Sequence, residues 1–291
     1  MQTDWTIHTL LDWTARFFNA KGISAPRLEA EILLAQALRQ DRVYLYVNYY
    51  QPVNNTERSL YKDYVARRAR GEPAAYIVGY KEFMSLRFKV NAQVLIPRPE
   101  TELLVETAMD IGKTTNINRI CDIGTGSGAV AVSLSYYCPQ TQVFAGDISA
   151  DALTVANENA KAHGVQVDFR QGDLLAPFLT EAPFNMIIAN LPYISDEIYG
   201  ELIPEIREYE PKLALIAGGD GLDIYRRLIP DAFHKLEPDG FFLFEIGHEQ
   251  RTGALELMQD FAEVRVLKDY AGLDRVIIGR KQPLWKQKYG R

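Results

Sequence analysis

Cysteine is scarce in this sequence, with only Cys121 and Cys138 among 291 residues. So few cysteines exclude a disulfide-stapled secreted scaffold, and neither stands in a Cys/His cluster with the spacing of a zinc site, so we expect no metal. Long apolar runs are missing too, since none reaches the roughly 18 residues needed to cross a bilayer. The N-terminus carries Asp4 and Asp12 where a signal peptide would be basic and then apolar. We therefore expect a cytoplasmic protein with no membrane partner.

An excess of positive charge is also lacking. Lys plus Arg (32) are outnumbered by Asp plus Glu (38), which gives a formal net charge of -6. This balance does not favour a polyanion as partner, so we expect no direct nucleic-acid contact. Hydrophobic residues make up 47% of the chain, enough for a sizeable core, and the length favours one large and one small domain.

The first 80 residues have the pattern of helices. Apolar residues recur at helical spacing from Ile7 to Phe18, and Ser24 with Pro26 marks the start of a second helix. A third helix is expected after a cap at Thr56. We therefore predict a small helical domain over residues 1–80.

A hairpin is expected next. Apolar and polar residues alternate from Met84 to Val90, which is the period of a strand with one wet face, and Val94–Ile96 would form a second strand. We predict that residues 81–100 are a β-hairpin linker.

From about residue 101, short apolar runs alternate with helical stretches, which predicts a mostly parallel sheet covered on both faces. The last two runs, 262–267 and 274–279, are joined by too few residues for a crossover helix, so they should be antiparallel neighbours. We expect an α/β, Rossmann-like domain over residues 101–282 and a basic tail at 283–291. The other predicted strands are 119–123, 142–146, 166–170, 184–189 and 241–245.

A glycine-rich loop, "DIGTGSG", joins the first sheet strand to a helix. Glycine permits a tight turn and lets a ligand approach the backbone closely. Asp147 ends the next strand, where a carboxylate can accept hydrogen bonds from ribose hydroxyls. The dinucleotide pattern G-x-G-x-x-G is not met, and a glycine turn with a helix-capping Asp would explain the same residues. The loop residues proposed to bind a nucleoside are Gly124, Thr125, Gly126, Ser127 and Gly128.

This loop resembles the first motif of the class I methyltransferases, which use S-adenosyl-L-methionine and release S-adenosyl-L-homocysteine. The antiparallel pair at the end of a parallel sheet is similar to that family's fold. The resemblance implies that Asp147 and Ile148 bind the cofactor. It also implies that Asp173, in "FRQGDLL", meets the adenine amino group while Leu174 lies near the ring. The alternative is that Asp173 is a simple turn residue.

The strand "FNMIIA" runs directly into "NLPY", residues 190–193. A planar amide or exocyclic amine is a poor nucleophile whose two hydrogens need two acceptors. The side-chain oxygen of Asn190 is one, and the carbonyl of Leu191 can be the second, because Pro192 favours an extended geometry there. Tyr193 offers a flat face for stacking. These four residues are therefore predicted to be catalytic and to bind the substrate, and Asn190 also borders the cofactor.

The tetrapeptide resembles the (N/D/S)-P-P-(Y/F) signature of methyltransferases that act on planar nitrogens, with Leu191 in place of the usual proline. The flanking stretches 71–106 and 210–229 resemble the peptide chain release factor glutamine methyltransferases, and this likeness covers essentially the whole chain. It implies methylation of N5 of the glutamine in the Gly-Gly-Gln motif of bacterial release factors, with residues 1–80 recognising that partner.

By the same resemblance, Arg98, Pro99 and Thr101 in "IPRPETE" border the site and bind substrate. A proline-fixed domain junction with a helix cap at Thr101 would explain them equally well. Two rival enzymes stay open: a ribosomal-protein glutamine N5-methyltransferase, and a DNA or RNA amino-methyltransferase that flips out its base. A nucleoside-binding scaffold without activity would leave "NLPY" unexplained.

Overall fold

The computed structural model describes residues 5–282, and the predicted basic tail, 283–291, lies outside them. The chain forms two compact units. Unit 1 comprises Met1–Tyr80 and Ile203–Tyr209, and unit 2 comprises Lys81–Leu202 and Glu210–Arg291. Within the described residues, no helix combines the length and apolar character needed to cross a membrane.

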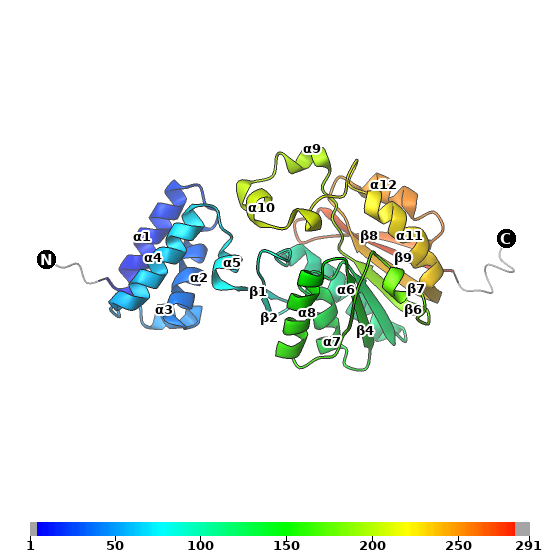
Figure 1. Cartoon of the computed structure of the whole chain (residues 1–291), viewed down its shortest axis with the longest axis horizontal. Helices are drawn as coiled ribbons and strands as arrows, with labels where there is room; N and C mark the ends of the chain where they lie inside the picture. Colours follow the sequence, from blue (N-terminus) through cyan, green and yellow to red (C-terminus); the bar gives the residue numbers. More distant parts are fainter. Residues whose placement is uncertain (1–4, 283–291) are drawn as a thin grey trace. The chain divides into compact units, whose positions relative to one another are not determined.

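Unit 1 is helical, as expected, but it contains two short helices that were not predicted, α3 and α5. The cap predicted at Thr56 is wrong. The side chain of Asn54 accepts from the backbone of Glu57 at 2.9 Å, and the Glu57 side chain accepts from Asn54 at 3.1 Å. This reciprocal capping box starts the helix one residue before Thr56. The helices are α1 Ile7–Ala20, α2 Pro26–Leu38, α3 Arg42–Val47, α4 Asn55–Ala69 and α5 Ala74–Val78 (Figure 1).

Unit 1 also contains the short helix α10 (Pro204–Tyr209), although this helix is more than 100 residues further along the chain than α5. Arg68 of α4, only 4% exposed, pairs with Glu205 of α10 at 2.7 Å and with Glu29 of α2 at 2.8 Å. The hydroxyl of Tyr209 donates to the carbonyl of Arg70 at 3.2 Å. Unit 1 is therefore built from two separate stretches of chain.

The hairpin exists, but of its two strands only the second lies within a predicted one, Met84–Val90. The strands are β1 Tyr80–Phe83 and β2 Leu86–Lys89, joined at Met84 and Ser85, whose φ angles of 50° and 58° fit a tight left-handed turn. Val94–Ile96 is not a strand, so that prediction was wrong. The Asn91 side chain accepts from the Gln93 backbone at 2.9 Å and bends the chain into a turn instead.

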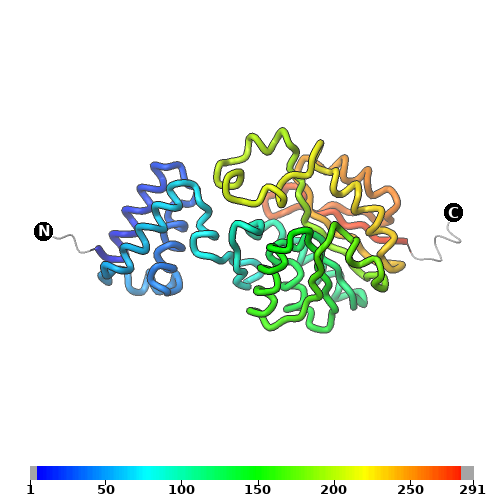
Figure 2. Tube along the Cα trace, viewed as in Figure 1, coloured from blue at the N-terminus to red at the C-terminus, as the bar shows by residue number. Residues whose placement is uncertain are grey.

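Unit 2 contains a seven-stranded sheet in the order β5-β4-β3-β6-β7-β9-β8. Strands β3 to β7 are parallel, and β9 runs antiparallel to both of its neighbours. In Figure 2 the part of the chain trace that forms the last two strands is coloured orange to red. The predicted fold class is confirmed. The strands are β3 Arg119–Ile123, β4 Gln142–Asp147, β5 Asp168–Gln171, β6 Phe184–Ala189, β7 Leu236–Glu245, β8 Ala262–Lys268 and β9 Asp274–Arg280.

Helices cover both faces of this sheet. Ile120 and Ile188 point to one core with α6 Glu102–Thr114, α7 Ala129–Tyr137 and α8 Ala150–Ala162. Cys121 and Ile187 point to the other core, with α11 Asp223–Lys235 and α12 Arg251–Leu257. The carboxyl ends of β3, β4 and β6 share one edge, where ligands bind in such folds. The short elements are η1 Pro99–Thr101, η2 Ala176–Phe178, α9 Asp196–Tyr199 and η3 Lys212–Ala214.

Candidate functional site

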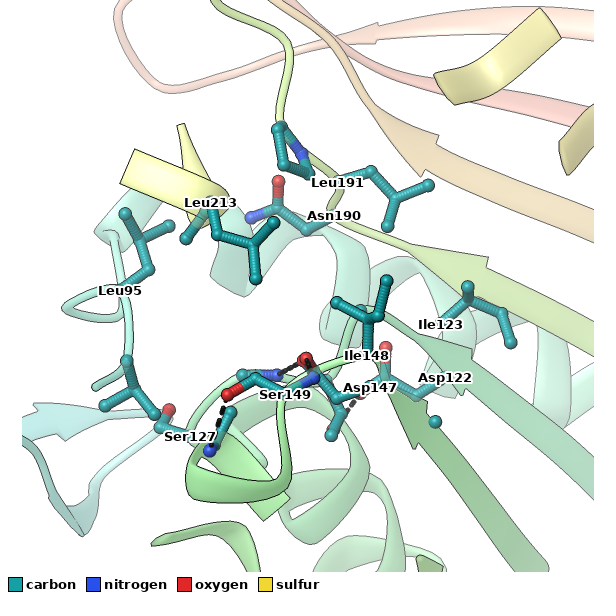
Figure 3. A pocket seen from close by; sticks show the side chains of 18 of the residues that line it. Leu95, Asp122, Ile123, Ser127, Asp147, Ile148, Ser149, Asn190, Leu191 and Leu213 are labelled. Carbon is teal, nitrogen blue, oxygen red and sulfur yellow. Dashed lines mark hydrogen bonds between the residues drawn. The ribbon is translucent and has the colours of Figure 1, made fainter. Parts of the chain in front are cut away.

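A cavity of about 480 Å³ lies at the carboxyl edge of the sheet in unit 2. It is formed by the glycine loop, the ends of β4 and β6, and the segment 211–214. Figure 3 shows Asn190 and Leu213 on one side of the cavity and Asp147, Ile148 and Ser127 on the other. The predicted residues around it are Thr101, Gly124, Thr125, Gly126, Ser127, Asp147, Ile148, Asp173, Leu174, Asn190, Leu191 and Pro192.

The glycine loop wraps around the carboxylate of Asp147. One oxygen accepts from the backbone of Gly126 at 2.8 Å, and the other accepts from the backbone of Ser149 at 2.9 Å. Each oxygen keeps further acceptor capacity for a ligand. Gly126 has a φ of +55°, and a side chain there would meet only open space. Burial raises the pKa of Asp147, although these backbone donors oppose the rise.

Sequence reasoning missed Asp122, whose side chain forms a hydrogen bond with the glycine loop. The hydroxyl of Thr125 donates to this buried carboxylate at 2.7 Å. Burial raises the pKa of Asp122 to about 7, partly against the effect of that hydrogen bond. An acidic residue inside an apolar strand just before the glycines was the available signal.

At the far edge of the cavity, Leu174 lines the wall with a left-handed φ of 49°. The carboxylate of Asp173 forms an ion pair with Arg227 of α11. Arg227 was also missed, because nothing in the sequence indicates that α11 reaches this loop. Asp173 is therefore held at the cavity by a cation.

The amide of Asn190 has a defined direction, because its nitrogen Nδ2 donates to the hydroxyl of Thr101 at 2.9 Å. The backbone N–H of Leu191 donates to the hydroxyl of Tyr225 at 3.1 Å. The Leu191 side chain packs on the glycine loop so closely that a Cβ at Gly124 would lie 2.5 Å from Leu191 Cδ2. The "NLPY" segment and the glycine loop are thus in direct contact.

Tyr193 is turned toward a buried carboxylate, and it is not among the residues that line the cavity. Its hydroxyl donates to Oε1 of Glu245 at 3.2 Å, and the hydroxyl of Thr101 donates to Oε2 at 2.7 Å. Thr101 stands at the N-cap position of α6, as the alternative reading had it, but its side chain makes no cap hydrogen bond to the backbone. Sequence reasoning missed Glu245, although an acid at the end of the apolar strand "FFLFE" was a signal.

Arg98 is engaged with Glu210, a carboxylate only 5% exposed that also accepts from the backbone of Ile96 at 3.2 Å. This pairing fastens the segment that continues into the cavity wall. Pro99 opens η1, and Gly128 precedes α7 and packs on Ala156. Arg98, Pro99 and Gly128 thus lie near the cavity without lining it, and a direct ligand contact for them stays a prediction.

Comparison with known proteins gives two family models, the PrmC N-terminal domain over residues 9–79 and the methyltransferase small domain over residues 99–204. Two solved structures have a similar fold. One is a Thermus thermophilus 16S rRNA methyltransferase (RsmC) in complex with AdoMet and guanosine, with 16% identity over 70% of this chain and 50% of that one, and a TM-score of 0.51. The other is the hMettl16 catalytic domain with a 3′UTR hairpin, with 17% identity over 75% and 81%, and a TM-score of 0.55.

Curated relatives named release factor glutamine methyltransferase match nearly the whole chain. The Geobacter sulfurreducens protein is 42% identical, covering 95% of this chain and 97% of its own length. The Moorella thermoacetica protein is 40% identical over 95% and 99%, and the Bacillus cereus protein is 34% identical over 95% and 99%. The resemblance found in the sequence is confirmed, and the chain belongs to the release factor glutamine methyltransferase family.

Proposed function

We propose that this protein transfers a methyl group from S-adenosyl-L-methionine to the side-chain amide nitrogen, N5, of a glutamine in bacterial peptide chain release factors. Family membership supports the reaction, and the geometry around Asn190 supports the acceptor chemistry. By the family resemblance the acceptor is the glutamine of the Gly-Gly-Gln motif. The partner is then a protein of the cytoplasm, where we also place this enzyme.

The observation that carries the proposal is the direction of the Asn190 amide. The Asn190 nitrogen is committed to Thr101, so its side-chain oxygen is the atom left to accept from a substrate. The carbonyl of Leu191 is the proposed second acceptor, because Pro192 adds no competing donor and favours an extended geometry at residue 191. Two such oxygens can hold both hydrogens of a primary amide and leave the face of its nitrogen free to react.

The cavity fits the proposed cofactor. Gly126 leaves open space beside the backbone, the Asp147 carboxylate can accept from ribose hydroxyls, and Ile148 and Leu174 supply apolar surface for a base. When bound, S-adenosyl-L-methionine supplies an electrophilic methyl group. The protein's own contribution is to hold the amide in place, and orientation of this kind can contribute roughly 7–11 kcal/mol to catalysis. No strong base is required, because the nitrogen becomes acidic once it is alkylated.

Incubation with radiolabelled S-adenosyl-L-methionine tests the proposal. The labelled cofactor and the enzyme are mixed separately with purified release factor, ribosomal protein and DNA, and the label is mapped by proteolysis and mass spectrometry. We expect label only on the release factor, at the glutamine side chain. A release factor carrying asparagine in place of that glutamine is the matched control and should stay unlabelled. Label on the ribosomal protein or on DNA would instead support one of the two rival substrates.

A further inference from the structure

Glu245 is a buried carboxylate at the end of β7 that contacts the candidate site from behind. Its side chain is 1% exposed, and both of its oxygens are used. Oε2 accepts from the hydroxyl of Thr101 at 2.7 Å, and Oε1 accepts from the hydroxyl of Tyr193 at 3.2 Å. Burying an ionisable group is costly unless its partners hold it in place, so its position in the site needs an explanation.

The hydrogen-bond chain through Thr101 has only one direction when Glu245 is ionised. A carboxylate can only accept, so the single hydroxyl proton of Thr101 must point toward Glu245. The Thr101 oxygen then presents a lone pair to Asn190 and must receive a proton from Nδ2, at 2.9 Å. The charge on Glu245 thereby fixes which end of the Asn190 amide faces the substrate.

The backbone of Glu245 orients the next residue of the motif. Its carbonyl accepts from the hydroxyl of Tyr225 at 2.8 Å, and the same Tyr225 oxygen accepts from the N–H of Leu191 at 3.1 Å. Tyr225 is fully buried, so this second chain is shielded from water. Glu245 is therefore linked through its side chain to the Asn190 amide, and through its backbone carbonyl to the N–H of Leu191.

Protonation of Glu245 would reverse the first chain. A protonated carboxyl can donate to Thr101, whose own proton would then turn to Asn190 and require an acceptor there. The Asn190 amide would rotate and present its N–H groups to the amide hydrogens of a substrate, which is repulsive. Burial raises the pKa of Glu245 to about 7, Glu100 adds to the rise, and Thr101, Arg275 and Tyr193 oppose it.

We propose that Glu245 is a positioning residue for methyl transfer, which acts through Thr101 to keep the Asn190 side-chain oxygen directed at the substrate amide. The inference rests on the proposed function. It assigns to Glu245 a role in turnover rather than in cofactor binding, because Glu245 does not line the cavity.

Steady-state kinetics of four variants test it. Glu245→Gln keeps the shape but can both donate and accept, so it no longer enforces one direction. Thr101→Val removes the relay, and Thr101→Ser is the matched control that keeps the hydroxyl. We expect kcat to fall roughly 10- to 100-fold in E245Q and T101V, the cofactor affinity of E245Q to stay unchanged by calorimetry, and T101S, which keeps the hydroxyl, to lose less activity than T101V. The double variant E245Q/T101V should be no slower than T101V, and wild-type kcat should rise with pH near 7 while that of E245Q does not.

A readout without turnover separates this inference from the proposed function. In ¹⁵N-labelled protein, the Asn190 side-chain NH2 signal, assigned by its loss in Asn190→Asp, should shift with pH around 7 in wild type and stay fixed in E245Q. If no release factor is methylated but the signal titrates, the proposed function fails and the relay stands. Equal kcat in wild type and E245Q, additive losses in the double variant, or the same titration in E245Q would overturn the inference.

Discussion

Replacing Glu245 with glutamine should stabilise unit 2 at pH 8, even though the variant is expected to turn over slowly. The carboxyl group is 1% exposed, and burial raises its pKa from an ordinary 4.5 to about 7. At pH 8 the Glu245 carboxylate is therefore ionised in both states, but it is buried away from water in the folded state and solvated in the unfolded state. At roughly 1.4 kcal/mol per pH unit, the difference between the two pKa values corresponds to about 3 kcal/mol.

The sign of the pH dependence follows from where the proton binds. Below pH 4.5 the carboxyl is protonated in both states, and the cost of the buried charge is absent. As pH rises from 4.5 through 7 the folded state holds the proton more tightly than the unfolded state, so the free energy of unfolding falls. Glutamine has no such proton. Asp122 and Asp147, whose pKa values are also raised, contribute to both proteins and cancel in the difference.

The assay must report on the sheet. The tryptophans are Trp5, Trp13 and Trp285, all outside residues 81–282, so hydrogen exchange of the β7 amides is the better probe. The quantity to compare is the free energy of unfolding of E245Q minus that of wild type. We expect this difference to be about 1–3 kcal/mol larger at pH 8 than at pH 5, since lost hydrogen bonds to a charged acceptor offset part of the gain. An equal difference at the two pH values would refute the reasoning.

Three further changes probe other parts of the site. Asn190→Ala should lower kcat far more than it weakens cofactor binding, because the Asn190 oxygen is proposed to hold the attacking amide. Asn190→Asp keeps an acceptor oxygen and should retain partial activity. Equal kcat in wild type and the alanine variant would contradict the proposed role of Asn190. Asp147→Ala should weaken S-adenosyl-L-methionine binding by roughly 10- to 100-fold in calorimetry, which corresponds to the loss of about 1.5–3 kcal/mol expected for a hydrogen bond to a charged group. Unchanged affinity would show that Asp147 does not bind the cofactor. Leu191→Pro restores the usual signature but removes the N–H that donates to Tyr225. We expect methyl transfer to survive and the free energy of unfolding, measured in urea, to fall by about 1 kcal/mol. An unchanged unfolding midpoint would show that this hydrogen bond contributes nothing to stability.

Local patterns in the sequence predicted the elements that lie around the cavity. β3 and β6 were predicted with their observed ends, because each is a short apolar run stopped by a recognisable polar motif. The glycine loop and "NLPY" were found for the same reason. Both are contiguous, and each residue's chemistry can be read from its neighbours. That they surround one cavity follows from the parallel order of β3, β4 and β6.

Some of the missed residues depend on contacts between distant segments. Glu245 meets Thr101 across 144 positions, and Tyr225 meets Leu191 across 34. No periodicity reports such pairs. The hairpin was misplaced because Met84 and Ser85 take the left-handed turn without the glycine or asparagine that usually marks one. Val94–Ile96 was predicted to be a strand because it is apolar. Val94 and Ile96 are buried, but the segment forms no strand.

The short helix α10 makes the two units topologically inseparable. The polypeptide leaves unit 2 after Leu202, contributes the six-residue helix α10 to unit 1, and re-enters unit 2 at Glu210. A fragment that begins at residue 81 would carry α10 without Arg68 and the Arg70 carbonyl, so Glu205 and Tyr209 would lose their partners. The orphaned helix lies in the same loop that starts at Tyr193. Loss of activity on deleting unit 1 would thus have two explanations, a disordered loop after Tyr193 or lost substrate recognition. Point variants that keep the contacts of α10 are the better way to test the role of unit 1.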